Sequence, residues 1–383
     1  MDGAGIPLEM AYLEITGIPL RAQESDFGPT VNLMLERGRG LSLLSSDGVL
    51  PGAVVDALTG YGRFTGEIFL NNRRIDPMPV RARAVKVLGD TPGIYPRLTV
   101  RENLELALRD RAVTDTESVF MVERELTESS LAGFDKVRAG MLDDTGRTIL
   151  SAARILLTGC DLLAITGLPV PGQKYAVDMN WHPGLQLDAL LELKGLLRRH
   201  KATWVSVLTD PACVQVLSDR VAVYAGGNLV QEGSLRECLN APQSRMIADF
   251  LSFPKMNYKT VRVEFDGPFV MLRSGRYGFR VSEFAKRHLT VKQDDEIVLG
   301  LRPEDIGLRP YETGDPTVIN LARVIRVDSL PGVQAVRLDL EGEEWVALTD
   351  SSKYISTGQL VELRPDPDRI HLFHPAHGGS LLD

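Results

Sequence analysis

Short apolar runs alternate with helical patterns between residues 40 and 224. Strand-like apolar runs are predicted at residues 40–44, 67–70, 161–165, 204–208 and 220–224. Apolar positions return at helical spacing in residues 54–58, 98–109 and 185–199. Strands that alternate with helices indicate an α/β layer fold on a mostly parallel sheet.

The pattern changes after Pro254. Short β-like runs separated by Gly, Pro and Asp follow, with little helical periodicity, at residues 260–265, 269–272, 296–301, 335–340 and 360–363. This spacing predicts a small antiparallel β-barrel. We therefore expect an α/β domain over residues 1–240, a linker over 241–257 and a β domain over 258–383.

Composition and charge exclude several classes of protein. Apolar residues make up 44% and charged residues 25% of 383 residues, which is typical of globular proteins. The net charge of -8 argues against a nucleic-acid partner, because phosphate binding needs a cationic surface. No run of about 20 apolar residues exists, so we expect no direct membrane insertion. Three scattered cysteines favour a reducing compartment over a disulfide framework.

Several stretches, in order along nearly the whole chain, carry a resemblance to a known family. They are residues 94–103 (IYPRLTVREN), 219–223 (DRVAV), 230–233 (VQEG), 252–257 (SFPKMN) and 299–305 (LGLRPED). Together they are similar to the ATPase subunits of ABC importers, in particular the sugar and polyol class with a C-terminal β regulatory domain. The resemblance implies an ABC-ATPase-like α/β domain of the P-loop NTPase type, followed by an OB-like β domain.

The phosphate-loop positions of this family carry unsuitable residues here. The family's loop ends in Gly-Lys-Ser/Thr at a helix N-terminus, where N–H groups, the Lys and the hydroxyl hold phosphate and magnesium. By the resemblance, Pro51 stands at the Lys position, and Gly52 and Ala53 stand at the hydroxyl positions. Pro51 lacks both a cation and a backbone donor. Asp47, beside Gly48, adds a negative charge, so the resemblance implies a degenerate phosphate loop.

Other catalytic positions of the family are altered in the same way. After the helix matched by Arg154, a strand should end in an Asp for magnesium and a Glu that activates water. Those positions are Thr166 and Gly167. The Q-loop glutamine position is Asp90, and the switch histidine position is Thr209. We therefore expect no catalytic residues in this chain.

The family's signature segment is also altered. In an ABC dimer the LSGGQ signature caps the terminal phosphate of the nucleotide held by the partner subunit. The matching residues are Leu142, Asp143, Asp144, Thr145 and Gly146. Two adjacent carboxylates facing a triphosphate would repel it.

The stretch after the Q-loop is a candidate contact with the membrane permease. In the resembled family this region helps to form the groove for the permease's coupling helix. The matching residues are Tyr95, Pro96, Arg97, Leu98 and Thr99. Thr99 and Glu102 also have the spacing of a helix capping box, which leaves the exposed face free for a partner.

We expect no metal site and no nucleophilic cysteine. His371, His374 and His377 have a spacing at which a metal site is conceivable. The segment around His371 resembles the final strand of the family's C-terminal domain, however, and this interpretation is favoured. Cys160 and Cys213 have no basic group nearby in the sequence that would activate a thiol.

Retained framework stretches with lost catalytic groups favour one function over two alternatives. We expect a non-catalytic nucleotide-binding-domain subunit of an importer for a sugar, polyol or similar small solute. It would pair with a second, active ABC ATPase subunit, which supplies any bound ATP and magnesium, and would couple to permease subunits. Its expected location is the cytoplasm, peripheral on the inner face of the cell membrane. The alternatives are a divergent but active ABC ATPase and a regulatory or scaffold pseudo-ATPase outside transport.

Overall fold

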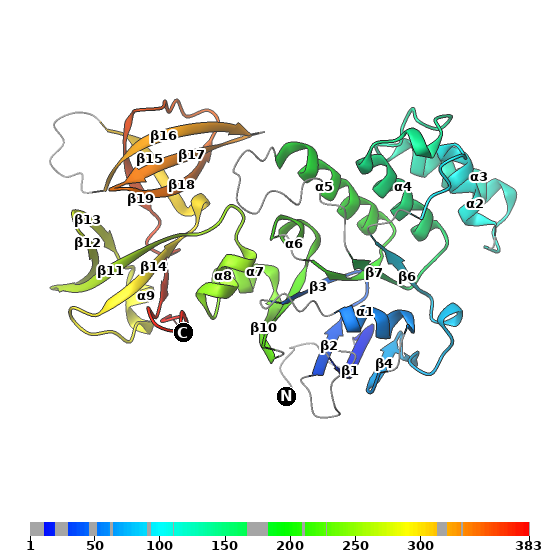
Figure 1. Cartoon of the computed structure of the whole chain (residues 1–383), viewed down its shortest axis with the longest axis horizontal. Coiled ribbons are helices and arrows are strands. Elements are labelled where there is room, and N and C mark those ends of the chain that lie inside the picture. The colour runs from blue at the N-terminus through cyan, green and yellow to red at the C-terminus, as the bar shows by residue number, and fades with distance from the viewer. Residues whose placement is uncertain are drawn as a thin grey trace. The chain divides into compact units, whose positions relative to one another are not determined.

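A computed structural model describes most of the chain (Figure 1). The described residues are 11–19, 30–45, 52–61, 64–89, 93–109, 111–166, 183–208, 211–226, 228–311, 320–330 and 332–382. By its internal contacts the chain divides into two compact units, Met1–Leu235 and Arg236–Asp383.

A mixed sheet of six strands forms the centre of the first unit, in the order β10-β9-β3-β8-β7-β6. Its strands are β3 (Gly40–Ser45), β6 (Val85–Leu88), β7 (Leu162–Thr166), β8 (Thr203–Val207), β9 (Arg220–Ala225) and β10 (Asn228–Ser234). All neighbours are parallel except β9 and β10. Strands β3, β7 and β8 are buried almost throughout, which explains their continuous apolar runs. The α/β class that the sequence predicts is confirmed.

A second, antiparallel sheet packs in the same unit, in the order β2-β1-β4-β5. Its strands are β1 (Leu13–Pro19), β2 (Thr30–Leu35), β4 (Glu67–Leu70) and β5 (Arg73–Arg74). Ile15 of β1, Val54 and Leu58 of α1 (Gly52–Thr59) and Leu43 of β3 are fully buried in one apolar core. Helix α1 therefore shares a core with both sheets.

Helices cover the central sheet and extend beyond it (Figure 1). They are α2 (Val100–Leu108), α3 (Asp115–Thr127), α4 (Asp144–Leu157), α5 (Pro183–Arg199) and α6 (Pro211–Leu217). Helix α4 packs against α2, α5 and β6, and α2 packs against α3. Capping boxes begin α2 at Thr99 and α3 at Thr114, so both helix starts are encoded locally.

The second unit combines short helices with two five-stranded antiparallel sheets. One sheet has the order β13-β12-β11-β14-β20 and the other β15-β19-β16-β17-β18. The strands of the first are β11 (Asn257–Asp266), β12 (Phe269–Ser274), β13 (Tyr277–Arg280), β14 (Glu296–Leu301) and β20 (His371–Phe373). Those of the second are β15 (Ile306–Pro310), β16 (Leu321–Leu330), β17 (Val333–Leu340), β18 (Glu343–Asp350) and β19 (Leu360–Pro365). The antiparallel β class is confirmed. The sequence does not predict how the strands divide between the two sheets, because the alternation of apolar and polar residues is the same for a strand of either sheet.

Three helices accompany these sheets: α7 (Leu235–Asn240), α8 (Arg245–Leu251) and α9 (Glu283–His288). Helix α8 lies within residues 241–257, for which the sequence suggests a linker. Ala248 of α8 packs in an apolar cluster with Met256, Val298 and Phe373. The limits of the domains stay a prediction, and the contacts assign α8 to the second unit.

Two buried asparagines tie the sheets of the second unit together. The side chain of Asn257, in β11, accepts a hydrogen bond from the N–H of Val346 in β18 at 2.7 Å and donates to its carbonyl at 2.8 Å. Asn320 accepts from the N–H of Gly278 at 2.9 Å and donates to its carbonyl at 2.8 Å. A side-chain amide offers both a donor and an acceptor, so each asparagine replaces a strand neighbour. Both sheets thus enclose one core.

Candidate functional site

The carboxyl ends of the parallel strands mark the edge where α/β sheets bind ligands. Strand pairing places Leu88 beside Ile165 and Thr166 beside Val207 at this edge. The candidate positions at this edge that lie within the described residues are Gly52, Ala53 and Thr166. The expected phosphate-loop, Q-loop, strand-end and switch positions Asp47, Gly48, Pro51, Asp90, Gly167 and Thr209 lie outside the described residues.

Gly52 and Ala53 form the N-terminus of α1. Neither side chain can supply a hydroxyl to a magnesium ion. A Cβ added at Gly52 would meet no atom within 4 Å. The space beside Gly52 therefore admits the Cβ atom of a larger residue.

Thr166 ends β7 and is half-buried. A Cβ added at Gly89 would lie 3.6 Å from its Oγ1, so the strand-end position lies beside the residue that precedes Asp90. The side chain here is a neutral hydroxyl. It offers neither the charge of a magnesium carboxylate nor a general base.

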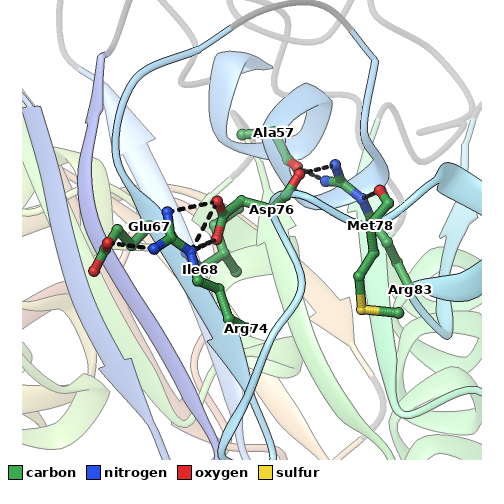
Figure 2. Close-up of polar contacts among 7 residues, drawn as sticks. All are labelled: Ala57, Glu67, Ile68, Arg74, Asp76, Met78 and Arg83. Atoms are coloured by element: carbon green, nitrogen blue, oxygen red, sulfur yellow. Dashed lines mark hydrogen bonds and ion pairs between the residues drawn. The ribbon is translucent and has the colours of Figure 1, made fainter.

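A buried arginine fixes the opposite end of α1 (Figure 2). Arg83 donates from Nη1 to the carbonyl of Ala57 at 2.5 Å, from Nη2 to that of Asp76 at 2.6 Å and from Nε to that of Met78 at 2.9 Å. Burial lowers the pKa of the guanidinium. Gly60 has a positive φ of 83°, and a Cβ there would lie 2.8 Å from Arg83 Cζ. The C-terminal turn of α1 is thus held in one position.

The carboxylate of Asp76 secures the same loop (Figure 2). Its Oδ1 accepts hydrogen bonds from Arg74 Nε at 3.0 Å and from the N–H of Ile68 at 3.1 Å, while Arg74 also pairs with Glu67 at 2.7 Å. Burial alone would raise the pKa of Asp76, but these hydrogen bonds outweigh it and the pKa is lowered. Protein groups satisfy both the carboxylate of Asp76 and the guanidinium of Arg74, so the role of these contacts is structural.

At the expected signature positions, Asp143 is the N-cap of α4. Its Oδ1 accepts the N–H of Gly146 at 2.7 Å. Asp144 is exposed and pairs with Arg147 at 3.3 Å, whereas Leu142 is buried. The carboxylate of Asp143 thus occupies a donor that a helix N-terminus would otherwise offer to an anion. The fourth of these positions, Thr145, is half-buried.

The permease-contact candidates form a hydrogen-bonded, largely exposed turn before α2. Tyr95, Pro96 and Arg97 are exposed, and Leu98 and Thr99 are half-buried. Asn103 of α2 is fully buried and holds the turn from behind. Its Oδ1 accepts the N–H of Tyr95 at 2.8 Å, and its Nδ2 donates to the Tyr95 carbonyl at 3.0 Å.

Two further contacts join this turn to the segment around α4. The guanidinium of Arg154 lies 4.7 Å from the ring centroid of Tyr95 and donates to the carbonyl of Asn103 at 3.0 Å. The N–H of Gly140 donates to the carbonyl of Pro96 at 3.0 Å. The turn, α2 and α4 therefore form one connected surface. The sequence does not reveal the roles of Asn103 and Arg154, although an asparagine at an apolar helix position is a signal for the first.

The histidines near the C-terminus do not assemble a metal site. His371 is buried in β20, where burial and the nearby Arg302 lower its pKa to about 4. The rings of His374 and His377 stack 3.9 Å apart, and each Nδ1 accepts a backbone N–H. Among the described residues, no group of at least three potential metal ligands comes together.

The thiol of Cys160 is also unsuited to nucleophilic chemistry. Burial raises its pKa to about 11, which keeps the thiol protonated at neutral pH.

No helix within the described part of the chain is long and apolar enough to cross a membrane.

Known proteins resemble the chain over most of its length. The sn-glycerol-3-phosphate import ATP-binding protein UgpC 2 of Agrobacterium fabrum is 24% identical over 376 residues, 95% of this chain and 94% of the relative. The maltose/maltodextrin import ATP-binding protein MalK of Vibrio parahaemolyticus is 24% identical over 361 residues, 90% of each. UgpC of Escherichia coli K12 is 26% identical over 346 residues, 85% of this chain and 92% of the relative. The chain is a homologue of the ATP-binding subunits of ABC importers.

This homology confirms the resemblance and the fold class predicted for the chain. No protein-family model matches it. Among solved structures, cbiO1 of Clostridium perfringens, part of the ABC transporter complex cbiONQ, aligns with a TM-score of 0.48 and 14% identity over 60% of this chain and 95% of that chain.

Proposed function

We propose that this chain is a non-catalytic ATP-binding-type subunit of an ABC importer for a small solute such as a sugar or polyol. Asp143 carries the proposal, because its carboxylate accepts the Gly146 N–H at the start of α4. In the resembled subunits this helix start caps the terminal phosphate of a partner's nucleotide. Here the N–H is already bonded, and a carboxylate repels an approaching anion.

The other described positions support the same function. Gly52 and Ala53 at the start of α1, and Thr166 at the end of β7, carry no charge that would hold magnesium or activate water. The framework around them is intact, since α1 is anchored by Arg83 and β7 lies inside the parallel sheet. The chain thus keeps the scaffold of an ATPase subunit without its catalytic groups.

The proposed partners follow from the absence of catalytic groups at these positions of the chain. A second ABC ATPase subunit with an intact phosphate loop supplies ATP and magnesium, and this chain completes the pair. The exposed turn of Tyr95, Pro96 and Arg97 contacts the permease subunits on the inner face of the cell membrane. The solute class rests on the relatives, which import sn-glycerol 3-phosphate or maltose and maltodextrin.

Calorimetric titration of the full chain with Mg-ATP tests the missing phosphate site. We expect no binding heat from the wild type. Binding in the low micromolar range that Gly52→Asp abolishes would contradict the proposal and indicate a divergent, active ATPase. Asp143→Ser tests the charge at the start of α4 separately from the capping hydrogen bond. Serine keeps a cap for α4 but removes the negative charge.

Affinity purification from detergent-solubilised native membranes tests the partners. We expect permease subunits together with a second ATPase that has an intact Gly-Lys-Ser/Thr loop. Recovery of permeases without a second ATPase would indicate a homodimer and contradict the non-catalytic assignment. Recovery of neither would place the chain outside transport, as a regulatory or scaffold protein.

A further inference from the structure

A buried carboxylate–imidazole pair joins α3 to the end of α5. Glu125 of α3 is 2% exposed, and its Oε1 lies 2.7 Å from Nε2 of His200, the residue after α5. This hydrogen bond joins the carboxyl group of Glu125 directly to the imidazole ring of His200. Oε2 of Glu125 has no hydrogen-bond partner. Arg124, on the same helix, lies 3.6 Å from Oε1.

Two more polar contacts connect the same elements. Arg199 pairs with Glu128 at 3.6 Å, and the N–H of Ser130 donates to Oε1 of Glu192 at 2.5 Å. Both carboxylates of these contacts are more exposed than Glu125, since 48% of the Glu128 side chain is accessible and the Ser130 contact is exposed. Only the Glu125–His200 contact of these three is withdrawn from solvent.

A second contact of α3 connects it to α2 and, through α2, to the permease-contact turn. Arg101 of α2 pairs with Glu123 of α3 at 2.7 Å. Asn103 of the same helix α2 holds Tyr95 through two hydrogen bonds. Contacts therefore run without a break from the exposed turn through α2 and α3 to α5.

Beyond His200 the chain enters the central sheet almost at once. The N–H of Ala202 donates to the carbonyl of Leu197, and β8 starts at Thr203. Strand β8 pairs with both β3 and β7, so its position is fixed by the sheet. His200 therefore connects helices α2 and α3, through Glu125, to the central sheet.

Stability alone does not account for this pair. A buried polar pair contributes little net stability, because the cost of desolvation offsets its attraction, and Oε2 of Glu125 is left without a donor. Helix α4 already attaches the layer by apolar packing, since it contacts α2 and α5 and buries Leu150 and Leu157. A directional hydrogen bond adds what apolar packing lacks, a single preferred orientation.

We propose that the Glu125–His200 pair is a positioning joint that sets the orientation of the α2–α3 layer on α5. Through α2 it also sets the direction in which the Tyr95–Thr99 turn faces. The role of this turn toward a permease rests on the proposed function, whereas the joint itself is a property of the chain. Glu125 and His200 act through other residues and touch no substrate.

Distance measurement by pulsed electron paramagnetic resonance on the full chain tests the joint. Spin labels are attached to Arg97→Cys, on the turn, and Asp56→Cys, on α1, both at exposed positions, in a Cys160→Ser background. We expect one narrow distance distribution for this labelled parent. Glu125→Gln keeps an acceptor for His200 and preserves the distribution, whereas the double variant Glu125→Leu/His200→Leu shifts and broadens it.

The matched control is Arg199→Ala, which removes an exposed pair between the same elements and leaves the distribution unchanged. His200→Asn is a second perturbation, because it shortens the side chain but keeps a polar group at a site that is 11% exposed. It broadens the distribution even if the leucine pair does not fold. An unchanged distribution in a folded leucine or asparagine variant overturns the joint.

This experiment contains no permease, so its outcome is separate from that of the purification. A shifted distribution without any recovered permease would keep the joint and reject the transport partner. An unchanged distribution with recovered permeases would do the reverse.

Discussion

Arg302 donates a hydrogen bond from Nη1 to Oγ of Ser252 at 2.7 Å. These residues belong to two separate stretches, 252–257 and 299–305, that carry the family resemblance. Nη2 of the same guanidinium donates to the carbonyl of Leu239 at 2.7 Å. Arg302 is 5% exposed, so one buried side chain holds α7, the end of α8 and the end of β14 together.

Replacing Arg302 should therefore destabilise the second unit. Arg302→Met keeps much of the apolar stem but leaves the Leu239 carbonyl and the Ser252 hydroxyl without their donor. We expect a loss of about 1–3 kcal/mol for each buried group left unpaired. Urea unfolding followed by fluorescence measures it. Arg309→Met is the control, because that side chain is 52% exposed, and an equal loss there would contradict the role of burial.

His371 should make the second unit sensitive to acid. Burial and Arg302 lower its pKa from 6.5 to about 4, so the folded state holds the neutral ring while the unfolded chain takes up a proton. This stability is present above pH 6.5 and is lost as the pH falls toward 4, up to about 3 kcal/mol. Urea unfolding of the wild type and of His371→Leu across this range should show a shallower pH dependence in the variant.

Asp305 acts in the opposite direction. Burial and the neighbouring Glu304 raise its pKa from 3.8 to about 6, so the folded state binds a proton there before the unfolded chain does. Its contribution grows as the pH falls from 6 to 3.8. We expect Asp305→Asn to lose stability more steeply on acidification than the wild type. Parallel curves would show that this carboxyl is ordinary.

Gly40 of β3 should tolerate no side chain. A Cβ there would lie 2.0 Å from the ring of Trp204, which is fully buried in β8. We expect Gly40→Ala to cost at least about 1–3 kcal/mol, because the core must shift. Thermal unfolding compares it with Gly52→Ala, where a Cβ meets nothing within 4 Å. Similar melting temperatures for the two variants would refute this packing.

Restoring the catalytic residues should not restore catalysis. The combined variant Pro51→Lys, Gly52→Ser, Thr166→Asp and Gly167→Glu returns the family's groups at these positions. Asp143 still blocks the Gly146 N–H, and Asp144 and Asp47 keep their charges. We expect no phosphate release above background from the isolated chain in a steady-state ATPase assay. Appreciable turnover would show that the acidic residues are tolerated.

The sequence predicts the buried strands better than the rest of the fold. Residues 40–44, 161–165, 204–208 and 220–224 correspond to β3, β7, β8 and β9, because strands covered on both faces are apolar throughout. Strands β1 and β2 were not predicted, since Gly17 and Pro19 interrupt the run of β1 and Asn32 and Thr30 that of β2. Helix α8 has only 7 residues, too few for a periodic signal.

For the candidate site, the sequence predicts which residues stand at the expected positions but not the contacts that they make. The identity of the residue at each motif position follows from the sequence alone, as for Thr166 and Gly52. The sequence gives the charge of Asp143 but not its hydrogen bond to Gly146, because capping depends on where α4 starts. The joint of Glu125 and His200 spans 75 positions, and no local pattern relates residues so far apart.

The amides of Asn257 and Asn320 have a consequence for how the second unit comes apart. Peeling one sheet from the other would break two hydrogen bonds at each asparagine and leave polar groups facing an apolar interior. Neither sheet can open alone at low cost. The unit should behave as one cooperative block, with amides on both sheets exchanging their protons at a common slow rate.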